Sequence, residues 1–270
     1  MGILPKDYKS AIKPIWCPGC GHYAVLSAIT KALAHLELKR EEVALLSGIG
    51  CSSRLPGYLD TYGFHGVHGR ALPLASGLKA ARPDLTVLAV GGDGDGFSIG
   101  GNHFLHACRR NMDLTYIVMD NRVYGMTKGQ ASPTTEPEWS HSPLTPHGTG
   151  IPRFRPAMIA LASGAGFIAR GYAGRPADLS RLLVAAIEHP GFAFVHVLSP
   201  CITFRPEQRG WKTQVHACEK ELKDPIEASR CVQEDDGFTL GVLYRNPQPA
   251  WQPQHQLVGS LARIEQEFLR

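Results

Sequence analysis

Between residues 43 and 198, short apolar runs alternate with longer stretches whose apolar residues recur at helical spacing. This alternation is typical of β-α-β units, which place successive strands in a mostly parallel sheet with right-handed crossovers. Runs such as Thr86–Val90 are apolar throughout and lack the polar alternation of a half-exposed strand. The sequence therefore predicts an α/β fold in which helices cover both faces of a mostly parallel sheet.

The predicted strands share a continuous apolar character, and they are Val43–Ser47, Thr86–Val90, Thr115–Met119, Phe167–Arg170 and Ala193–Leu198. The predicted helices precede or connect these strands, and they are about His22–Leu36, Arg70–Ala81, Gly100–Arg110, Ala157–Gly164 and Pro176–His189. We expect residues 1–200 to form one domain. Residues 201–270 are expected to form a C-terminal extension that packs on this domain or on a partner subunit.

Two polar stretches interrupt this rhythm. Residues 121–156 contain six prolines, and a loop of this length in a compact domain is usually a lid or a binding segment. Residues 201–237 combine many charges with few large apolar side chains. This second stretch fits either a solvated, partly disordered tail or an ordered surface that binds a partner.

Composition excludes several classes of protein. The net charge is only +4 over 270 residues and the basic residues are scattered, which argues against a nucleic-acid-binding face. No run approaches the roughly 18 apolar residues that a membrane span requires. Residues 1–16 carry charges with no apolar segment behind them, so they do not resemble a secretory signal. We therefore expect a soluble, cytoplasmic protein that binds neither nucleic acid nor membrane.

A segment rich in glycine and aspartate, residues 91–96 (GGDGDG), directly follows the predicted strand Thr86–Val90. Parallel sheets bind ligands at this carboxyl edge, where glycine lets backbone N–H groups approach phosphate oxygens and the next helix attracts the anion. A carboxylate inside such a loop would repel phosphate unless a cation lay between them. Asp93 therefore indicates Mg²⁺, which prefers hard oxygen ligands.

The next predicted strand ends in Asp120-Asn121-Arg122-Val123. Together with Gly-Asp-Gly about 25 residues earlier, it resembles the thiamine diphosphate fingerprint, although Asp120 replaces the first Asn of the usual pair. By this resemblance Asp93, Asn121 and the main-chain carbonyl of Val123 would complete the Mg²⁺ shell. The loop lacks the Gly-Lys-Ser/Thr ending of a P-loop, and Phe97 breaks the dinucleotide register. The alternative is a glycine-rich turn of purely structural importance.

The seven cysteines are too few for a disulfide-stapled scaffold. Cys17 and Cys20 flank a Pro-Gly turn, which fits half a zinc site, a redox pair or half an iron–sulfur site. No predicted strand precedes Cys17, which disfavours a thioredoxin-type motif. Cys51 and Cys201 follow predicted strands, so four thiolates could meet at one sheet edge around a [4Fe–4S] cluster. The other thiols, in an apolar helix or in the charged C-terminal region, receive no ligand role: Cys108, Cys218 and Cys231.

Five motifs, in unbroken order from about residue 7 to residue 201, resemble the β subunit of the 2-oxoacid:ferredoxin oxidoreductases. They are WCPGCGH at 16–22, GIGCSS at 48–53, HGRA at 68–71, GDGD at 92–95 and MDNRVYGMT at 119–127. The resemblance implies a thiamine diphosphate-binding fold with a single [4Fe–4S] cluster on Cys17, Cys20, Cys51 and Cys201. It also implies an α subunit that supplies the pyrimidine-binding domain and the activating Glu, so that this chain is catalytically incomplete alone.

The resemblance also implies the residues around the cofactor: His22, Ile49, Gly50, Ser52, His68, Gly92, Asp93, Gly94, Asp95, Asn121, Val123, Tyr124, Gly125, Met126 and Thr127. His68, Arg70 and Lys128 are the predicted catalytic residues. For His22, Ile49 and Arg70 a structural role is the alternative, as a helix cap, as strand-end packing and as an ion-pair partner, respectively. A solvated loop lysine is the alternative for Lys128.

The implied activity is coenzyme A-dependent oxidative decarboxylation of a 2-oxoacid, with electrons passed through the cluster to ferredoxin and CO₂ fixation in reverse. A cation at Lys128 would suit the distal carboxylate of 2-oxoglutarate, which is the predicted substrate. We expect an αβ or (αβ)₂ assembly. Three alternatives are another or broader 2-oxoacid specificity, a non-redox thiamine diphosphate decarboxylase subunit, and a zinc-stabilised interaction subunit.

Overall fold

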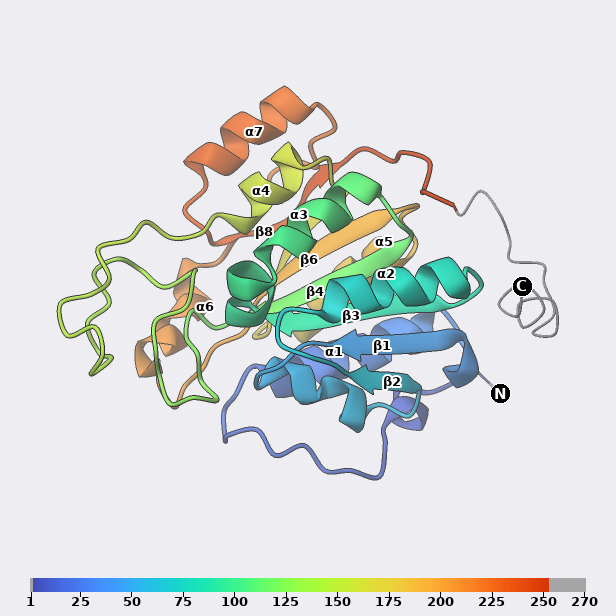
Figure 1. The fold of residues 1–270 in the computed structure, drawn as a ribbon, viewed down its shortest axis with the longest axis horizontal. Coiled ribbons are helices and arrows are strands. Elements are labelled where there is room, and N and C mark those ends of the chain that lie inside the picture. Colours follow the sequence, from blue (N-terminus) through green and yellow to red (C-terminus); the bar gives the residue numbers. More distant parts are fainter. Residues whose placement is uncertain (1, 253–270) are drawn as a thin grey trace, which may run out of the picture.

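A computed structural model describes residues 2–252 of the protein. Its centre is a sheet with strand order β2-β1-β3-β4-β6-β5-β8-β7, in which every neighbouring pair is parallel except β5 and β8 (Figure 1). The strands are β1 (Val43–Ser47), β2 (Tyr62–His65), β3 (Thr86–Gly92), β4 (Leu114–Asp120), β5 (Phe167–Tyr172), β6 (Phe192–Leu198), β7 (His216–Ala217) and β8 (Thr239–Arg245). The predicted α/β fold with a mostly parallel sheet is confirmed.

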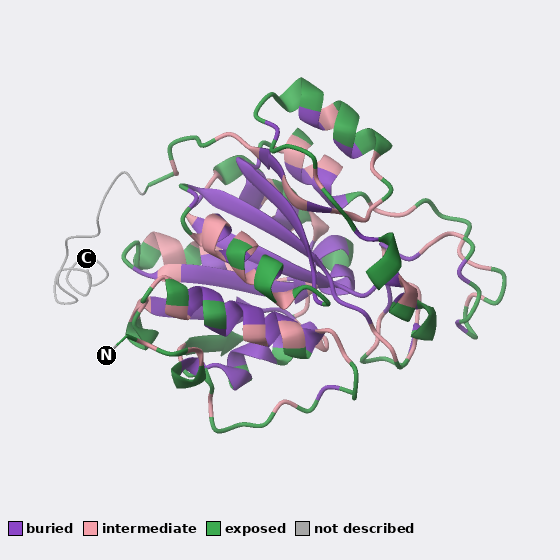
Figure 2. Cartoon of the chain, turned by 180° about the vertical axis from the view of Figure 1, so that it is seen from behind, coloured by how far each residue is buried: buried purple, intermediate pink, exposed green. Residues whose placement is uncertain are grey.

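The sheet lies between two layers of helices, and its central strands are buried on both faces (Figure 2). One face is covered by α1 (His22–His35) and α5 (Pro176–Ile187). The other face is covered by α2 (Ala71–Ala81), α3 (Gly101–Arg110), α4 (Pro156–Ala162) and α7 (Pro225–Glu234), while the short α6 (Trp211–Gln214) lies beside the C-terminal strands. Proline at the first position of α4, α5 and α7 suits a helix start, since its missing N–H has no partner there.

All five predicted strands and all five predicted helices are confirmed, with small shifts at their ends. The sequence analysis missed β2, β7 and β8. Strand β2 is an exposed edge strand, so it lacks the continuous apolar run that a buried strand requires. Strand β7 spans two residues, and β8 is interrupted by Gly241.

Residues 201–252 include α6, α7, β7 and β8. Strand β8 pairs with β5 in the antiparallel direction, and α7 packs against α4. The side chain of Asp224 caps α7 by accepting hydrogen bonds from the backbone N–H groups of Ile226 and Glu227. The predicted boundary at residue 200 stays a prediction, and residues 253–270 of the predicted extension lie outside the described residues.

The polar loop of residues 121–155 contains no helix or extended strand. It leaves the carboxyl end of β4 and returns to the sheet through α4, and it projects at the left of Figure 1. Within residues 2–252, no helix is both long enough and apolar enough to cross a membrane.

A buried histidine after α5 makes a pH-dependent contribution to stability. His189 is 4% exposed, its Nε2 has no hydrogen-bond partner among residues 2–252, and its ring lies 5.3 Å from that of Phe167. Burial and then the charge of Arg245 lower the pKa of His189 to about 4. In the unfolded chain its pKa is about 6.5.

Because its folded pKa is depressed, His189 protonates preferentially in the unfolded chain. Its contribution to stability is present above pH 6.5 and is lost as the pH falls toward 4. The free energy of unfolding of wild type falls between pH 7 and pH 4.5, and we expect this fall to be smaller by roughly 2 kcal/mol in His189→Leu. Thermal unfolding across this range tests it, with the exposed His147→Leu as the control. If the stability of wild type and of His189→Leu changed equally with pH, the prediction would be refuted.

Candidate active site

A cavity of about 570 Å³ lies at the carboxyl edge of β1, β3 and β4. The register places Ser47 beside Val90 and Gly92 beside Met119, so the loops after these three strands open at the same place. The cavity is lined by every residue predicted to bind the cofactor, and also by Cys51, Met119 and Gln130. The structure thus brings the predicted set together, while the binding role of each residue stays a prediction.

Asp93 is buried directly after β3, with one carboxylate oxygen engaged and one free. Its Oδ2 accepts a hydrogen bond from the hydroxyl of Ser132 and lies 2.8 Å from the hydroxyl of Thr134. Its Oδ1 has no hydrogen-bond partner among residues 2–252. Burial and then the neighbouring charge of Asp120 raise the pKa of Asp93. A buried carboxylate held in this way has one oxygen available for a cation.

The hydroxyl of Thr134 lies 2.8 Å from carboxylate oxygens of both Asp93 and Asp120. One hydroxyl proton can serve only one of them, so the second contact requires a proton on a carboxyl group or a cation nearby. The chemistry of these oxygens therefore fits a divalent cation beside Asp93.

Two further oxygens face the same region from the loop after β4. The Oδ1 of Asn121 accepts a hydrogen bond from the backbone N–H of Val123 at 3.2 Å, which folds the loop into a tight turn. Arg122, between them, has a φ of 53°, in the left-handed region. The carbonyl of Val123 has no hydrogen-bond partner among residues 2–252. Asp93, Asn121 and Val123 thus offer three hard oxygen donors, which is a set that fits Mg²⁺.

Asp95 organises the loops around the cavity. Its Oδ1 accepts hydrogen bonds from the backbone N–H groups of Ile49 (2.9 Å) and Gly69 (2.7 Å), and it lies 2.8 Å from Nδ1 of His68. A Cβ atom on Gly48 would lie 2.0 Å from Oδ2 of Asp95, so only glycine fits there. Its Oδ2 is buried without a partner among residues 2–252. Through the three contacts of Oδ1, this carboxylate fixes the loop after β1 and the turn that carries His68.

Tyr124 closes one side of the cavity. Its ring packs on Gly94, where a Cβ atom would lie 2.2 Å from the ring, and its hydroxyl donates to the carbonyl of Gly94 at 3.2 Å. Gly94 must therefore lack a side chain for two reasons: the ring of Tyr124 packs on it, and a phosphate ligand would have to approach its backbone.

Three of the four thiols predicted to hold a cluster are half-buried, and Cys17 is exposed. The backbone N–H of Gly21 donates to the carbonyl of Pro200, which seats the Cys17–Cys20 turn against the segment that carries Cys201. A Cβ atom on Gly125 would lie 3.7 Å from Sγ of Cys201 and 3.8 Å from Sγ of Cys51. The four thiols therefore converge beside the cavity, and Cys51 lines it.

Burial is the largest cause of a raised pKa at Cys20, Cys51 and Cys201, and for Cys20 it brings the pKa to about 12. Mutual repulsion between the thiolates raises these pKa values further. No three His, Cys, Asp or Glu side chains of residues 2–252 are close enough to hold a single metal ion. Four cysteine thiols gathered at one place are the donor set that an iron–sulfur cluster uses.

His22, two residues after Cys20, is buried and lines the cavity. Its Nδ1 lies 2.7 Å from the hydroxyl of Ser199, and burial lowers its pKa to about 4, so the ring is neutral. Trp16 packs edge-on against His22 and donates from its ring N–H to the carbonyl of Cys51 at 2.6 Å. Trp16 thus supports both the thiol cluster and the wall of the cavity.

Two of the predicted catalytic residues do not line the cavity. Arg70 precedes α2 and donates to the carbonyl of His68 at 3.3 Å, so it supports the turn that carries this histidine. Lys128 is exposed, between Thr127 and Gln130, which do line the cavity. It has a φ of 76°, so the loop holds it in the left-handed region.

The sequence analysis missed several residues that support the site. Ser132 and Thr134 bond Asp93 from the polar loop, and neither lies in a motif. Gln208 is fully buried; its Oε1 accepts from the N–H of Cys201 at 2.8 Å, and its Nε2 donates to the carbonyl of Asn121 at 2.7 Å. Only the tertiary fold brings these residues to the site. The one sequence signal was the length of the polar loop.

Asp120 begins a buried polar network behind Asp93. It lies 2.8 Å from Nε2 of His196, whose Nδ1 accepts a hydrogen bond from Arg170 at 3.2 Å. An accepting Nδ1 means that His196 is neutral and donates from Nε2, and burial accordingly lowers its pKa. Burial alone would raise the pKa of Asp120, but the hydrogen bond from His196 and the charge of Arg122 lower it. Asp120 is therefore the ionised member of the pair with Asp93.

Comparison with known proteins agrees with this geometry. Residues 48–197 match the family described as "Thiamine pyrophosphate enzyme, C-terminal TPP binding domain". The chain is 38% identical over 256 residues to the 2-oxoacid:ferredoxin oxidoreductase 2 subunit beta of Aeropyrum pernix, an alignment that covers 89% of this chain and 82% of that protein. It is 48% identical over 199 residues to the 2-oxoglutarate oxidoreductase subunit KorB of Mycobacterium tuberculosis, covering 74% of this chain and about half (53%) of that protein.

Among solved structures, the fold is similar to a 2-oxoglutarate:ferredoxin oxidoreductase from Magnetococcus marinus with 2-oxoglutarate, coenzyme A and succinyl-CoA bound. The TM-score is 0.89 at 40% sequence identity, and the match covers 98% of this chain and 91% of that chain.

Proposed function

The chain belongs to the β subunits of the 2-oxoacid:ferredoxin oxidoreductases, and on this premise we propose that, with an α subunit, it converts 2-oxoglutarate, coenzyme A and oxidised ferredoxin to succinyl-CoA, CO₂ and reduced ferredoxin. Two electrons leave the substrate, and two one-electron ferredoxins accept them. The printed names of the relatives support the reaction class, and the substrates bound in the Magnetococcus marinus enzyme support the choice of 2-oxoacid. The same reaction in reverse would fix CO₂.

One observation carries the redox assignment: Cys51 lines the cavity and also belongs to the thiol cluster. A non-redox decarboxylase needs only the cavity, and a zinc-stabilised interaction subunit needs only the thiols. In this chain the cavity and the thiol cluster have Cys51 in common. Electrons released in the cavity would therefore travel only a short distance to a cluster on Cys17, Cys20, Cys51 and Cys201.

When bound, thiamine diphosphate supplies the nucleophilic carbon and the electron sink for decarboxylation, and the cluster accepts electrons singly. Asp93, Asn121 and the carbonyl of Val123 would hold Mg²⁺ against the diphosphate. Asp95 orients the loop of Ile49 and the turn of His68 toward the cavity.

The chain's remaining contribution to the reaction is exclusion of water and positioning of the cofactor. Tyr124 and Met126 flank the opening beside the thiols. His68 lies at the cavity wall, held by Asp95, where it could hold or move a proton during turnover. His22, neutral and buried, forms part of the cavity wall.

The assignment of 2-oxoglutarate depends on a cation for its distal carboxylate. Among residues 2–252 neither lysine nor arginine lines the cavity, and the exposed Lys128 directly follows Thr127, which does line it. No acidic side chain of residues 2–252 forms an ion pair with it. We propose that Lys128 meets the distal carboxylate when the α subunit closes over the cavity.

Lys128→Ala is expected to raise the KM for 2-oxoglutarate by about tenfold, with no change in the KM for pyruvate, because one charge-assisted contact is lost. Ferredoxin reduction at varied substrate concentration measures both. The exposed Lys212→Ala is the matched control. If the two KM values respond alike to Lys128→Ala, Lys128 has no part in substrate selection.

The proposed activity is tested with the complex of this chain and its α subunit, purified without oxygen. Ferredoxin reduction is measured with 2-oxoglutarate, pyruvate or a branched-chain 2-oxoacid, each with and without coenzyme A. The proposal predicts that 2-oxoglutarate has the highest kcat/KM and that reduction requires coenzyme A. A higher kcat/KM for pyruvate would move the enzyme to another or broader specificity, and CO₂ release without ferredoxin reduction would support a non-redox decarboxylase.

The partners and the setting complete the proposal. An α subunit follows from the naming of the relatives as β subunits. We propose ferredoxin as the electron acceptor, an αβ or (αβ)₂ assembly, and a cytoplasmic location, since a reducing compartment keeps the seven cysteines as thiols.

A further inference from the structure

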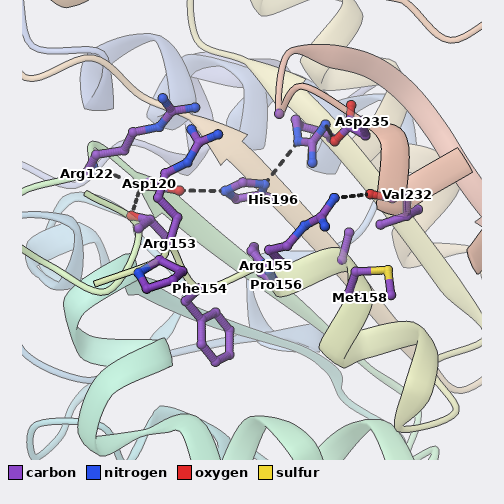
Figure 3. A pocket seen from close by; sticks show the side chains of 15 residues that line it. Asp120, Arg122, Arg153, Phe154, Arg155, Pro156, Met158, His196, Val232 and Asp235 are labelled. Atoms are coloured by element: carbon purple, nitrogen blue, oxygen red, sulfur yellow. Dashed lines mark hydrogen bonds and ion pairs between the residues drawn. The ribbon is translucent and has the colours of Figure 1, made fainter. Parts of the chain in front are cut away.

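A second cavity, of about 330 Å³, lies between the polar loop, α4, α7 and the strands β4, β5 and β6 (Figure 3). It shares no lining residue with the cavity described above. Four of its lining residues are arginines, and they are Arg122, Arg153, Arg155 and Arg170. We call it the arginine cavity.

Two of the four guanidinium groups have carboxylate partners. Arg170 pairs with Asp235 at 2.7 Å, and Arg122 pairs with Glu136. Arg122 also lies over the ring of Trp211, at 4.9 Å from its centroid. These two arginines are held in place by the fold itself.

The other two have no carboxylate partner among residues 2–252. Arg155 donates to the backbone carbonyls of Val232 and Gln233 at the end of α7. Arg153 forms neither a hydrogen bond nor an ion pair with any described residue. Asp235 pairs with Arg170 and Glu136 pairs with Arg122, so Arg153 and Arg155 are the two arginines of the cavity without a carboxylate partner among residues 2–252.

Two of these positive charges converge. A Cβ atom on Gly237 would lie 3.5 Å from Nη2 of Arg122 and 4.0 Å from Nη1 of Arg153, so both guanidinium groups face the same point. Burial, and then the charge of Arg122, lower the pKa of Arg153. Asp235, two residues before Gly237, also lines the cavity, and its Oδ1 is buried without a hydrogen-bond donor among residues 2–252. The cavity thus presents unmatched donors at one place and an unmatched acceptor at another.

We propose that the arginine cavity binds a small organic polyanion, with a carboxylate or phosphate group between Arg122 and Arg153 and a hydroxyl group that donates to Asp235. Guanidinium groups recognise both kinds of anion through paired hydrogen bonds. The volume lies at the lower end of the range for small-molecule sites, so it suits a ligand of roughly 8 to 15 heavy atoms. This site is separate from the proposed cofactor site, and the proposal does not depend on the identity of the 2-oxoacid.

The arginine cavity is linked to the proposed Mg²⁺ site by a short chain of hydrogen bonds. Asp120 lines the arginine cavity and is bonded through Thr134 to Asp93, with 2.8 Å at each step. A ligand that changes the position of Asp120 would therefore act on the carboxylate that is proposed to hold the cation. Coupling between the sites would be reciprocal, since each ligand changes the affinity for the other by the same factor.

The test uses the complex with its α subunit, with Mg²⁺ and thiamine diphosphate kept saturating and the ionic strength held constant. Malate and glycerol 3-phosphate, each of which carries a hydroxyl group, are titrated while the thermal unfolding midpoint is followed. Wild type should show a saturable rise of several degrees with at least one of them. Malate alone would identify carboxylate ligands, and glycerol 3-phosphate alone would identify phosphate ligands.

Arg153→Ala should weaken this binding about tenfold or more, because one charge-assisted contact is lost. Without ligand the variant should unfold at the wild-type temperature or higher, because Arg153 has no partner to lose. The exposed Arg209→Ala should bind as wild type. Should Arg153→Ala fold poorly, Arg153→Gln replaces it, since a glutamine keeps part of the aliphatic stem and a polar end but not the charge.

Two results would overturn the proposal: no saturable stabilisation of wild type by either anion, or equal stabilisation of wild type and the Arg153 variant. Ferredoxin reduction measured on the same preparations separates this outcome from a failure of the proposed function. A complex that is active but binds neither anion refutes the arginine cavity alone.

Discussion

Asp93→Asn is expected to lower turnover by roughly a thousandfold or more, because the change removes the one buried carboxylate among residues 2–252 that is placed to hold a cation against the diphosphate. Asp95 is also buried at this cavity, but its Oδ1 is occupied by three contacts and its buried Oδ2 lies against Gly48. Turnover should fall because the cofactor binds more weakly. Calorimetry would then show that the affinity of the variant for thiamine diphosphate no longer depends on Mg²⁺.

The same change should not destabilise the fold. Burial and the charge of Asp120 already oppose ionisation of Asp93, so a neutral amide of the same shape relieves repulsion. We expect the unfolding midpoint of the cofactor-free variant to equal or exceed that of wild type. The exposed Asp84→Asn serves as the control for both measurements. Magnesium-dependent cofactor binding by Asp93→Asn at wild-type affinity would contradict the assigned role.

Cys17→Ser is expected to lower ferredoxin reduction to about a hundredth or less, because a hydroxyl is a poor replacement for a thiolate ligand of an iron–sulfur cluster. Cys17 is exposed and does not line the cavity, so thiamine diphosphate binding should persist. This separation of electron transfer from cofactor binding distinguishes a cluster ligand from a residue of the cofactor pocket.

Cys231→Ser is the matched control, since Cys231 is also exposed but lies on α7, away from the four converging thiols. Iron content and the electron paramagnetic resonance signal of the reduced protein should be unchanged in Cys231→Ser and lost in Cys17→Ser. A full iron complement in Cys17→Ser would remove this residue from the ligand set.

Those parts of the fold that depend on local sequence were predictable. The apolar run of β3 and the acidic glycine loop after it are contiguous, so a parallel sheet necessarily brings Asp93 to its carboxyl edge. Asn121 and Cys201 follow β4 and β6 in the same way, and the register places Asp120 beside Leu198. The placement of Asp93, Asn121 and Cys201 at one edge of the sheet thus followed from the parallel direction of the strands.

What the sequence could not give were contacts between distant polar residues. Gln208 joins Cys201 to Asn121, and nothing in a charged stretch distinguishes this glutamine from its neighbours. The exposed edge strand β2 has no apolar run to reveal it. Arg70 and Lys128 lie in or beside motif segments, but their side chains do not line the cavity. Motif position predicts proximity to a site, whereas the direction of a side chain depends on packing.

The arginine cavity illustrates the same limit. Arg122 belongs to the segment after β4, Arg153 and Arg155 to the end of the polar loop, and Arg170 to β5. These residues converge only when the polar loop folds back over the sheet (Figure 3).

The central claim is that one chain joins a thiamine diphosphate site to a [4Fe–4S] cluster. The most direct test is the content of iron, acid-labile sulfide, zinc and thiamine diphosphate in the complex purified without oxygen. The account predicts about four irons and four sulfides for each copy of this chain, together with one thiamine diphosphate. One zinc ion without sulfide would contradict the cluster and, with it, the transfer of electrons to ferredoxin.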